Sequence, residues 1–355
     1  MEVLSKGISA RIEWVFDLAR RHEEHFNSPE AWLSRKRYLA EHPTAVLVLK
    51  CMDGRINIPV ATDTPAGIIQ PFRNLGGMFN LGWPHLGETL AHAVDQIASS
   101  GRRALALITY HFSKGDPHRG CAGFDYRTAD AVAHTYAIRA QVEHTFGREH
   151  GTVYPLVCGF ETDEDALILH AERGDETLDL GALTPEARDA LGPRVAALYP
   201  SMPAQVRDDL LPLLRGNLAR IDALRRAPPR TLDISHREWM ICVGRGFDFL
   251  HTPNLALIIG PYSPDLADPI RKAAGIIQAN MDGGRIPDDG FLLLAAAPYE
   301  ERGVDRARAE LKSRFMAGFA AAVIEQEFPA LARKMHQRTC VLDWRTRGLA
   351  PISAR

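Results

Sequence analysis

The chain has 355 residues, of which 46% are hydrophobic and 24% charged, a composition that excludes an intrinsically disordered chain. Its 42 Lys and Arg against 44 Asp and Glu give a net charge of −2, so we expect neither nucleic acid nor a membrane surface as a partner. The longest apolar run, 315–324, is too short to span a bilayer. The first residues of the sequence contain charged side chains and no apolar segment of the kind found in a secretory signal. We therefore expect a cytoplasmic protein.

The first half of the chain predicts strands that alternate with helices. Residues 45–49 form an unbroken apolar, β-branched run, typical of a strand buried on both faces. The predicted elements are, in chain order, a helical segment (1–42), strands at 45–49 and 67–69, a helix (86–97), a strand (104–110), a helix (128–146) and a hairpin (153–169) that turns at 162–164. This alternation favours an α/β fold with a largely parallel sheet flanked by helices.

The second half predicts a helical region and then a repeat of the first unit. Residues 171–230 are leucine-rich with helical spacing, and Pro228-Pro229 marks the predicted domain boundary. The repeated elements are strands at 239–243, 255–259 and 290–299, a long helix (305–335) and a closing hairpin (339–352). We therefore predict a fold duplicated within one chain as a pseudo-dimer. The predicted segments are an N-terminal helical segment (1–42), a first copy (43–175), a helical linker (176–230) and a degenerate second copy (231–355).

Cysteine and histidine residues follow two of the predicted strands. The first strand leads into Cys51-Met52-Asp53-Gly54-Arg55, and the third ends at His111, with nine residues between it and Cys121. Because ligand sites in parallel sheets lie beyond the carboxyl ends of the strands, we expect these three ligand residues to meet. Two cysteines and one histidine leave the fourth position of a zinc ion open, as in catalytic zinc sites. The cysteines expected in the apolar core are Cys158, Cys242 and Cys340.

Three motifs in this order resemble the β-class carbonic anhydrases. They are Cys51-x-Asp53-x-Arg55, then Arg73-Asn74-Leu75-Gly76, then His111 with Cys121. Most members of that family have two residues between the histidine and the second cysteine, whereas nine separate them here. The longer gap, the helical N-terminal segment and the degenerate second copy are together similar to the carboxysome shell carbonic anhydrase branch.

The histidine ligand has an alternative. His118-Arg119-Gly120-Cys121 reproduces the short family spacing, but His118 lies in a Gly- and Pro-containing loop. His111 directly follows the strand, which fixes its side chain relative to Cys51, and we favour it as the ligand.

The resemblance implies one zinc ion per chain and reversible hydration of carbon dioxide to bicarbonate. It assigns the metal to Cys51, His111 and Cys121, with Asp53 orienting the reacting water and Arg55 holding the Asp53 carboxylate away from the metal. It also implies a homodimer of pseudo-dimeric chains. The second copy lacks these ligands, since Tyr299-Glu300 stands where Tyr110-His111 would be.

Two other functions remain open at this point. One is a carbonyl sulfide or carbon disulfide hydrolase on the same fold. The other is a non-catalytic zinc-bearing scaffold, against which Asp53 and Arg55 argue because a structural zinc needs neither. The short stretch before the first copy leaves no room for the long disordered region by which the carboxysome branch engages Rubisco, so carboxysome packaging is not expected.

Overall fold

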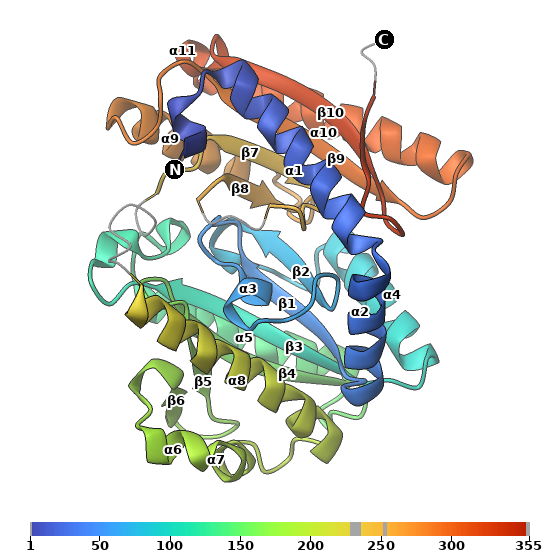
Figure 1. The fold of residues 1–355 in the computed structure, drawn as a ribbon, viewed down its shortest axis with the longest axis vertical. Helices are drawn as coiled ribbons and strands as arrows, with labels where there is room; N and C mark the ends of the chain where they lie inside the picture. The colour runs from blue at the N-terminus through green and yellow to red at the C-terminus, as the bar shows by residue number, and fades with distance from the viewer. Residues whose placement is uncertain (1, 228–235, 251–253, 353–355) are drawn as a thin grey trace. The chain divides into compact units, whose positions relative to one another are not determined.

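The computed structural model describes residues 2–227, 236–250 and 254–352, and within them the chain forms two compact units (Figure 1). The first-sheet unit consists of Leu33–Cys51 and Ile56–Ile234. The second-sheet unit consists of Met1–Trp32, Met52–Arg55 and Ser235–Arg355. The four residues after Cys51 therefore belong to the unit formed mainly by the second copy. The predicted boundary at Pro228-Pro229 lies outside the described residues.

The first-sheet unit contains a six-stranded sheet in the order β2-β1-β3-β4-β5-β6. Its strands are β1 (Ala45–Cys51), β2 (Ile69–Asn74), β3 (Ala104–Phe112), β4 (Val153–Glu161), β5 (Ala166–His170) and β6 (Thr177–Asp179). The first four strands in the sheet order run parallel, and β5 and β6 are antiparallel to their neighbours. Every residue of β4 and β5 is buried, as their unbroken apolar runs require in a sheet that is covered on both faces.

Helices cover both faces of this sheet. They are α3 (Ile58–Ala61), α4 (Pro84–Ser99), α5 (Thr128–Phe146), α6 (Pro185–Asp189), α7 (Leu191–Leu198) and α8 (Ala204–Arg226), and α2 (Pro29–Glu41) leads into the unit. In Figure 1, α8 lies in front of the sheet and α5 lies behind it. Helix α4 begins at a proline, which is well placed in a first turn, and ends just before Gly101 at a φ of 72°.

The second-sheet unit repeats this topology. Its sheet order is β11-β10-β9-β7-β8, which matches β5-β4-β3-β1-β2 strand for strand. In both sheets four neighbouring strands are parallel and the strand that follows them in the sheet order, β5 or β11, is antiparallel to its neighbour. The strands are β7 (Met240–Gly244), β8 (Ala256–Ile259), β9 (Phe291–Tyr299), β10 (Met335–Asp343) and β11 (Leu349–Pro351), and the helices are α1 (Ile8–Phe26), α9 (Ala267–Asp282), α10 (Val304–Glu327) and α11 (Pro329–Ala332). The predicted α/β fold with an internal duplication is confirmed.

Several predicted boundaries were wrong for identifiable reasons. The long helix expected at 305–335 ends at Glu327, because Pro329 cannot continue its hydrogen-bond ladder, and Met335 already begins β10. The N-terminal helical segment is two helices, with Pro29 starting the second. Strand β2 extends through Asn74, so Arg73-Asn74 lies within the strand instead of after it. Strand β6, which lies in the predicted linker at 176–230, and helix α9 were not predicted from the sequence.

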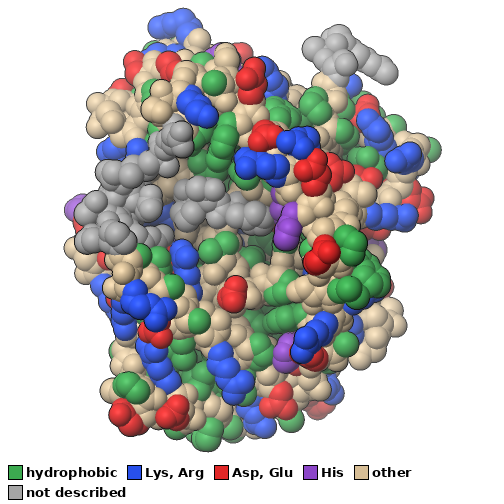
Figure 2. Space-filling view, in the orientation of Figure 1, with side chains coloured by type: hydrophobic (Ala, Val, Ile, Leu, Met, Phe, Trp, Pro, Cys, Tyr) green, Lys and Arg blue, Asp and Glu red, His purple; other side chains and the backbone are tan. Residues whose placement is uncertain are grey.

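No helix in the described part of the chain is long and apolar enough to cross a membrane. On the face shown in Figure 2, basic and acidic side chains are interspersed. This distribution agrees with the near-neutral net charge of the sequence.

Candidate metal centre

The structure brings together the three side chains that the sequence predicts as metal ligands. One sulfur atom each from Cys51 and Cys121 and one ring nitrogen of His111 all lie within 4.8 Å of one another. Cys51 is the last residue of β1, and His111 lies near the end of β3, which pairs with β1 in parallel. The carboxyl ends of the two strands therefore hold two of the three ligands on rigid backbone, and all three residues are buried.

Glycines allow the third ligand to approach. Gly77 has a φ of 67°, and a Cβ atom there would lie 3.3 Å from the Cys51 backbone nitrogen. Gly123 packs against Gly76, whose Cα would lie 2.7 Å from an added Cβ. These close backbone contacts require glycine and bring the loop that carries Cys121 against the turn that follows β2.

The nine residues between His111 and Cys121 form a loop that the β4–β5 hairpin holds in place. Glu161, at the end of β4, is buried, and its carboxylate accepts the backbone N–H of Lys114 at 2.9 Å. Asp163, in the hairpin turn, accepts the hydroxyl of Ser113 and the backbone N–H of Gly115, at 2.9 and 2.8 Å. Burial raises the pKa of Glu161, which its backbone N–H donors partly offset. The hairpin therefore fixes the nine-residue loop between His111 and Cys121 through hydrogen bonds.

The donor set fits a divalent metal ion. Burial raises the pKa of the Cys51 thiol well above its usual value, the adjacent Cys121 raises it further, and His111 acts in the opposite direction. A pair of thiolates buried together is costly without a cation, whereas two thiolates match the double charge of zinc. Two sulfur ligands and one imidazole also leave one tetrahedral position open, as in catalytic zinc sites.

The alternative ligand His118 and the three cysteines expected in the core lie elsewhere. His118 is exposed in a short 3-10 helix, and its ring packs edge-on against Tyr126 with ring centroids 5.4 Å apart. Cys158 is buried in β4, where burial raises the pKa of its thiol to about 12. Cys242 and Cys340 are buried in β7 and β10, as expected. Among the described residues, no comparable group of cysteine and histidine side chains occurs in the second sheet.

Asp53 and Arg55 form a buried ion pair with two side-chain hydrogen bonds. The Arg55 guanidinium donates to both carboxylate oxygens of Asp53, from Nε at 3.1 Å and from Nη2 at 2.6 Å. The backbone N–H of Arg55 adds a third hydrogen bond to the carboxylate at 2.8 Å. Both side chains are almost inaccessible to solvent, so the charges compensate each other in a medium of low dielectric.

A histidine and a glutamate that the sequence analysis missed extend this pair. Arg55 Nη2 lies 3.1 Å from His236 Nε2, and His236 Nδ1 lies 3.0 Å from a carboxylate oxygen of Glu238. Since guanidinium only donates, Nε2 is the acceptor, so a neutral His236 carries its proton on Nδ1 and donates it to Glu238. The available signal in the sequence was a glutamate, Glu238, next to the apolar run that begins at Trp239 and leads into β7, a position at which the structure buries it fully.

The segment that carries Asp53 and Arg55 is fixed by β8. The carbonyl oxygen of Met52 accepts the backbone N–H of Ile258 at 2.9 Å. A Cβ atom on Gly54 would lie 2.6 Å from the carbonyl oxygen of Ala256, so only glycine fits between Asp53 and Arg55.

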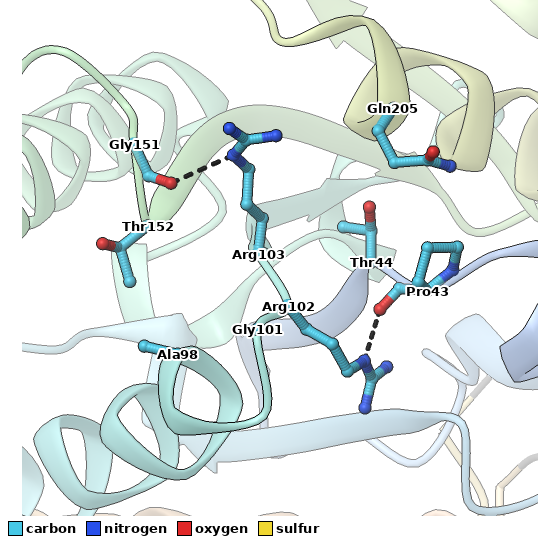
Figure 3. Close-up of a pocket in the computed structure, with 9 residues that line it drawn as sticks. All are labelled: Pro43, Thr44, Ala98, Gly101, Arg102, Arg103, Gly151, Thr152 and Gln205. Carbon is cyan, nitrogen blue, oxygen red and sulfur yellow. Dashed lines mark hydrogen bonds between the residues drawn. The ribbon is translucent and has the colours of Figure 1, made fainter.

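A separate cavity of about 370 Å³ lies at the other end of the first sheet (Figure 3). Its lining includes Thr44, Arg103 and Thr152, which directly precede β1, β3 and β4. Arg102 donates to the carbonyl oxygen of Pro43, and Arg103 donates to that of Gly151 at 3.0 Å. Because the candidate ligands lie at the carboxyl ends of β1 and β3, this cavity is no part of the metal centre.

Comparisons with known proteins show which family and structures the chain is similar to. Residues 42–185 match the family model described as Carboxysome Shell Carbonic Anhydrase, catalytic domain. Carboxysome shell carbonic anhydrases from Prochlorococcus marinus strain MIT 9313 and Hydrogenovibrio crunogenus are 29% and 28% identical to this chain, over 59% and 60% of its length. The chain covers 46% of each, so it spans about half the length of these relatives. The solved β-carbonic anhydrase CcaA is 12% identical, covers 44% of this chain and 87% of its own, and has a TM-score of 0.33.

Proposed function

We propose that the chain, whose residues 42–185 match the catalytic-domain model of the carboxysome shell carbonic anhydrases, catalyses zinc-dependent, reversible hydration of carbon dioxide to bicarbonate. The observation that carries the proposal is the convergence of Cys51, His111 and Cys121, whose ligand atoms lie within 4.8 Å of one another at the carboxyl ends of β1 and β3. The first copy would then hold one metal ion, and the second copy none.

The reaction combines water and carbon dioxide and releases bicarbonate and one proton. When bound, zinc supplies Lewis-acid chemistry that lowers the pKa of the reacting water. Asp53 lies two residues after Cys51, so the chain itself keeps this carboxylate near the ligand set. In the proposed mechanism Asp53 accepts a hydrogen bond from the reacting water and orients one oxygen lone pair towards carbon dioxide.

Arg55 keeps Asp53 in this role. Two hydrogen bonds from one guanidinium fix the carboxylate in position and lower its tendency to bind the cation itself. His236, held by Glu238, accepts a hydrogen bond from the same guanidinium and limits its rotation. Hydrogen bonds connect the side chains of Asp53, Arg55, His236 and Glu238 in one polar network.

Metal content and carbon dioxide hydration, measured together, test the proposal. The purified chain should hold one zinc per polypeptide and hydrate carbon dioxide in a stopped-flow assay. Cys51→Ser and Cys121→Ser should each lose the metal and the activity, whereas Cys158→Ser, which changes an equally buried cysteine outside the centre, should keep both. A chain without zinc, or one whose zinc survives Cys51→Ser, would refute the assignment.

Two further comparisons separate the remaining alternatives. His111→Ala should release zinc and His118→Ala should retain it, and the reverse result would move the ligand role to the exposed loop. Turnover of carbonyl sulfide or carbon disulfide that exceeds carbon dioxide hydration would favour the hydrolase alternative. A loaded chain that turns over none of these substrates would favour the scaffold.

The location of the protein is a separate proposal. The curated relatives are named carboxysome shell proteins, which supports a place in the carboxysome as the alternative to the cytoplasmic location expected from the sequence. Co-purification of the chain with intact carboxysomes would support the first, and recovery in the freely diffusing fraction the second.

A further inference from the structure

The side chain of Asn217 joins three segments of the first-sheet unit. It lies in the middle of α8 and is completely buried. Its Nδ2 donates to the carbonyl oxygen of Ala61 at 2.9 Å and to that of Asp165 at 2.7 Å, and its Oδ1 accepts the backbone N–H of Leu167 at 3.0 Å. The amide therefore uses both of its donor hydrogens and its acceptor in contacts between segments that lie far apart in the sequence.

Two of these contacts fix the turn of the β4–β5 hairpin. Asp165 directly precedes β5 and has a φ of 56°, a left-handed conformation that residues other than glycine rarely adopt. The hydrogen bonds of Asn217 to the Asp165 carbonyl oxygen and to the Leu167 N–H secure the backbone on both sides of Ala166. The asparagine thus stabilises a turn conformation that is unfavourable on its own.

Two arginines of α8 hold the same turn. The Arg220 guanidinium lies 3.0 and 2.9 Å, from Nε and Nη2, from one carboxylate oxygen of Asp165. Arg225 donates to both carboxylate oxygens of Glu164, at 2.9 and 2.7 Å. The two arginines follow Asn217 by three and eight residues, which places all three side chains on one side of the helix.

The other half of the turn holds the loop that carries Cys121. Besides the hydrogen bonds from this loop to Glu161 and Asp163 described above, Arg119 donates to the Asp163 carboxylate at 3.3 Å. Arg119 stands two residues before Cys121, so this contact reaches almost to the ligand. Residues 161–163 therefore hold the loop, whereas residues 164–167 are themselves held by α8.

Helix α8 has a fixed position of its own, because it packs directly on α3. A Cβ atom on Gly216 would lie 2.0 Å from the carbonyl oxygen of Thr62, so only glycine allows this approach. The hydrogen bond from Asn217 to Ala61, the last residue of α3, reinforces the contact. The hairpin turn therefore binds to a helix that is anchored elsewhere.

From these contacts we infer that α8, chiefly through Asn217, positions the candidate metal ligand Cys121. The helix fixes the hairpin turn, the turn fixes the loop that follows His111, and the loop places the Cys121 sulfur. Asn217 is a positioning residue, since it acts through the turn. The consequence for zinc rests on the proposed function, whereas the placement of Cys121 does not.

Thiol labelling of the metal-free full chain tests this placement without zinc. Asn217→Leu keeps a side chain of similar size but removes three hydrogen bonds, so the turn and the loop should open more often. Iodoacetamide should then label Cys121 about tenfold faster than in the wild type, measured by mass spectrometry of its tryptic peptide. Cys340, buried in the second-sheet unit, should keep its labelling rate.

Leu210→Ala is the matched control for loss of stability. Leu210 is buried on α8 about two turns before Asn217, and its truncation leaves a cavity without removing any of the three hydrogen bonds. It should lower the melting temperature while labelling of Cys121 stays close to the wild-type rate. Equally fast labelling in Leu210→Ala and Asn217→Leu would mean that general destabilisation exposes the thiol, and the inference would be wrong.

A milder pair of variants decides the question if Asn217→Leu does not fold. Arg220→Gln breaks the ion pair with Asp165 in the hairpin turn. Asp222→Ala breaks the ion pair with Arg188, at 2.8 Å, which joins α8 to α6 instead. Only Arg220→Gln should speed the labelling of Cys121, and equal rates in the two variants would overturn the inference.

Zinc loss to a chelator separates the inference from the proposed function. Loaded Asn217→Leu should release zinc about tenfold faster than the wild type, as expected for residues that support metal ligands. Its cobalt-substituted form should also differ from the wild type in visible absorption, because the ligand geometry changes. A wild-type chain that binds no metal would refute the proposed function alone, since labelling of Cys121 still decides the inference. Unchanged zinc release together with an unchanged cobalt spectrum would refute the role of Asn217.

Discussion

Replacing Arg55 by alanine should destabilise the second-sheet unit more than any exposed arginine would. The side chain makes two hydrogen bonds to Asp53 and one to His236, and 2% of its surface is accessible. Arg55→Ala removes two side-chain hydrogen bonds from the buried Asp53 carboxylate, which keeps the hydrogen bond from the backbone N–H of residue 55. Removing one partner of a buried ion pair costs about 3–5 kcal/mol, because the other charge stays desolvated.

That free energy converts into a measurable melting shift. For a domain of roughly 150–250 residues, each kcal/mol lowers the melting temperature by about 2–4 °C, which gives a loss of about 6–20 °C for Arg55→Ala. Arg55→Lys should recover only part of the loss, because an ammonium group restores the charge but cannot donate two parallel hydrogen bonds to one carboxylate.

Differential scanning calorimetry of the metal-free and zinc-loaded chain measures the shift. Arg20→Ala is the control, because Arg20 lies in the same unit and pairs with Asp17 and Glu24 on an exposed face of α1. Such exposed pairs contribute little to stability, so the control should barely move the transition. If Arg55→Ala shifts the transition no more than Arg20→Ala does, the pair is not the buried, connected group described here.

Two more predictions concern the first-sheet unit. Gly77→Ala should lower the stability of this unit and its zinc retention more than Gly101→Ala does. Both positions have a positive φ, which costs alanine about 1–2 kcal/mol. Only at Gly77 would the new Cβ also crowd the Thr109 carbonyl oxygen, at 3.1 Å. Equal losses in urea unfolding and metal content would show that crowding is absent. His134 is neutral when folded, since burial lowers its pKa below 6.5 and its Nε2 accepts the backbone N–H of Phe79. The unfolded chain therefore takes up the proton first, so the free energy of unfolding should fall as pH drops below about 6.5. In urea titrations at pH 7 and pH 5, His134→Gln should reduce the difference between the two free energies of unfolding. An unchanged difference would exclude His134 as the cause.

The sequence predicted those parts of the fold that depend on local pattern. Unbroken apolar runs marked β1 and β3, because strands in a covered parallel sheet have no polar face to reveal a period of two. Helix α5 was predicted at its observed bounds, since its stop at Phe146 is followed by Gly147 at a φ of 93°. The convergence of the candidate ligands was also predictable, because Cys51 and His111 stand at the ends of strands whose parallel pairing brings them to one edge.

What the sequence could not supply were contacts between distant segments. Nothing near Arg55 indicates that His236 accepts its hydrogen bond, because 181 residues separate the two. The anchoring of the long loop by Glu161 is hidden for the same reason, since a glutamate at a strand end usually faces solvent.

The duplication assigns different tasks to the two copies. The first copy holds all three candidate metal ligands, yet Met52–Arg55, which directly follow Cys51, belong to the unit of the second copy. Strand β8 fixes this segment through Ile258, and the residues just before β7 supply His236 and Glu238 to Arg55. If Asp53 orients the reacting water as proposed, the second copy is required although it holds none of the candidate ligands, because contacts within its own unit fix the segment that carries Asp53.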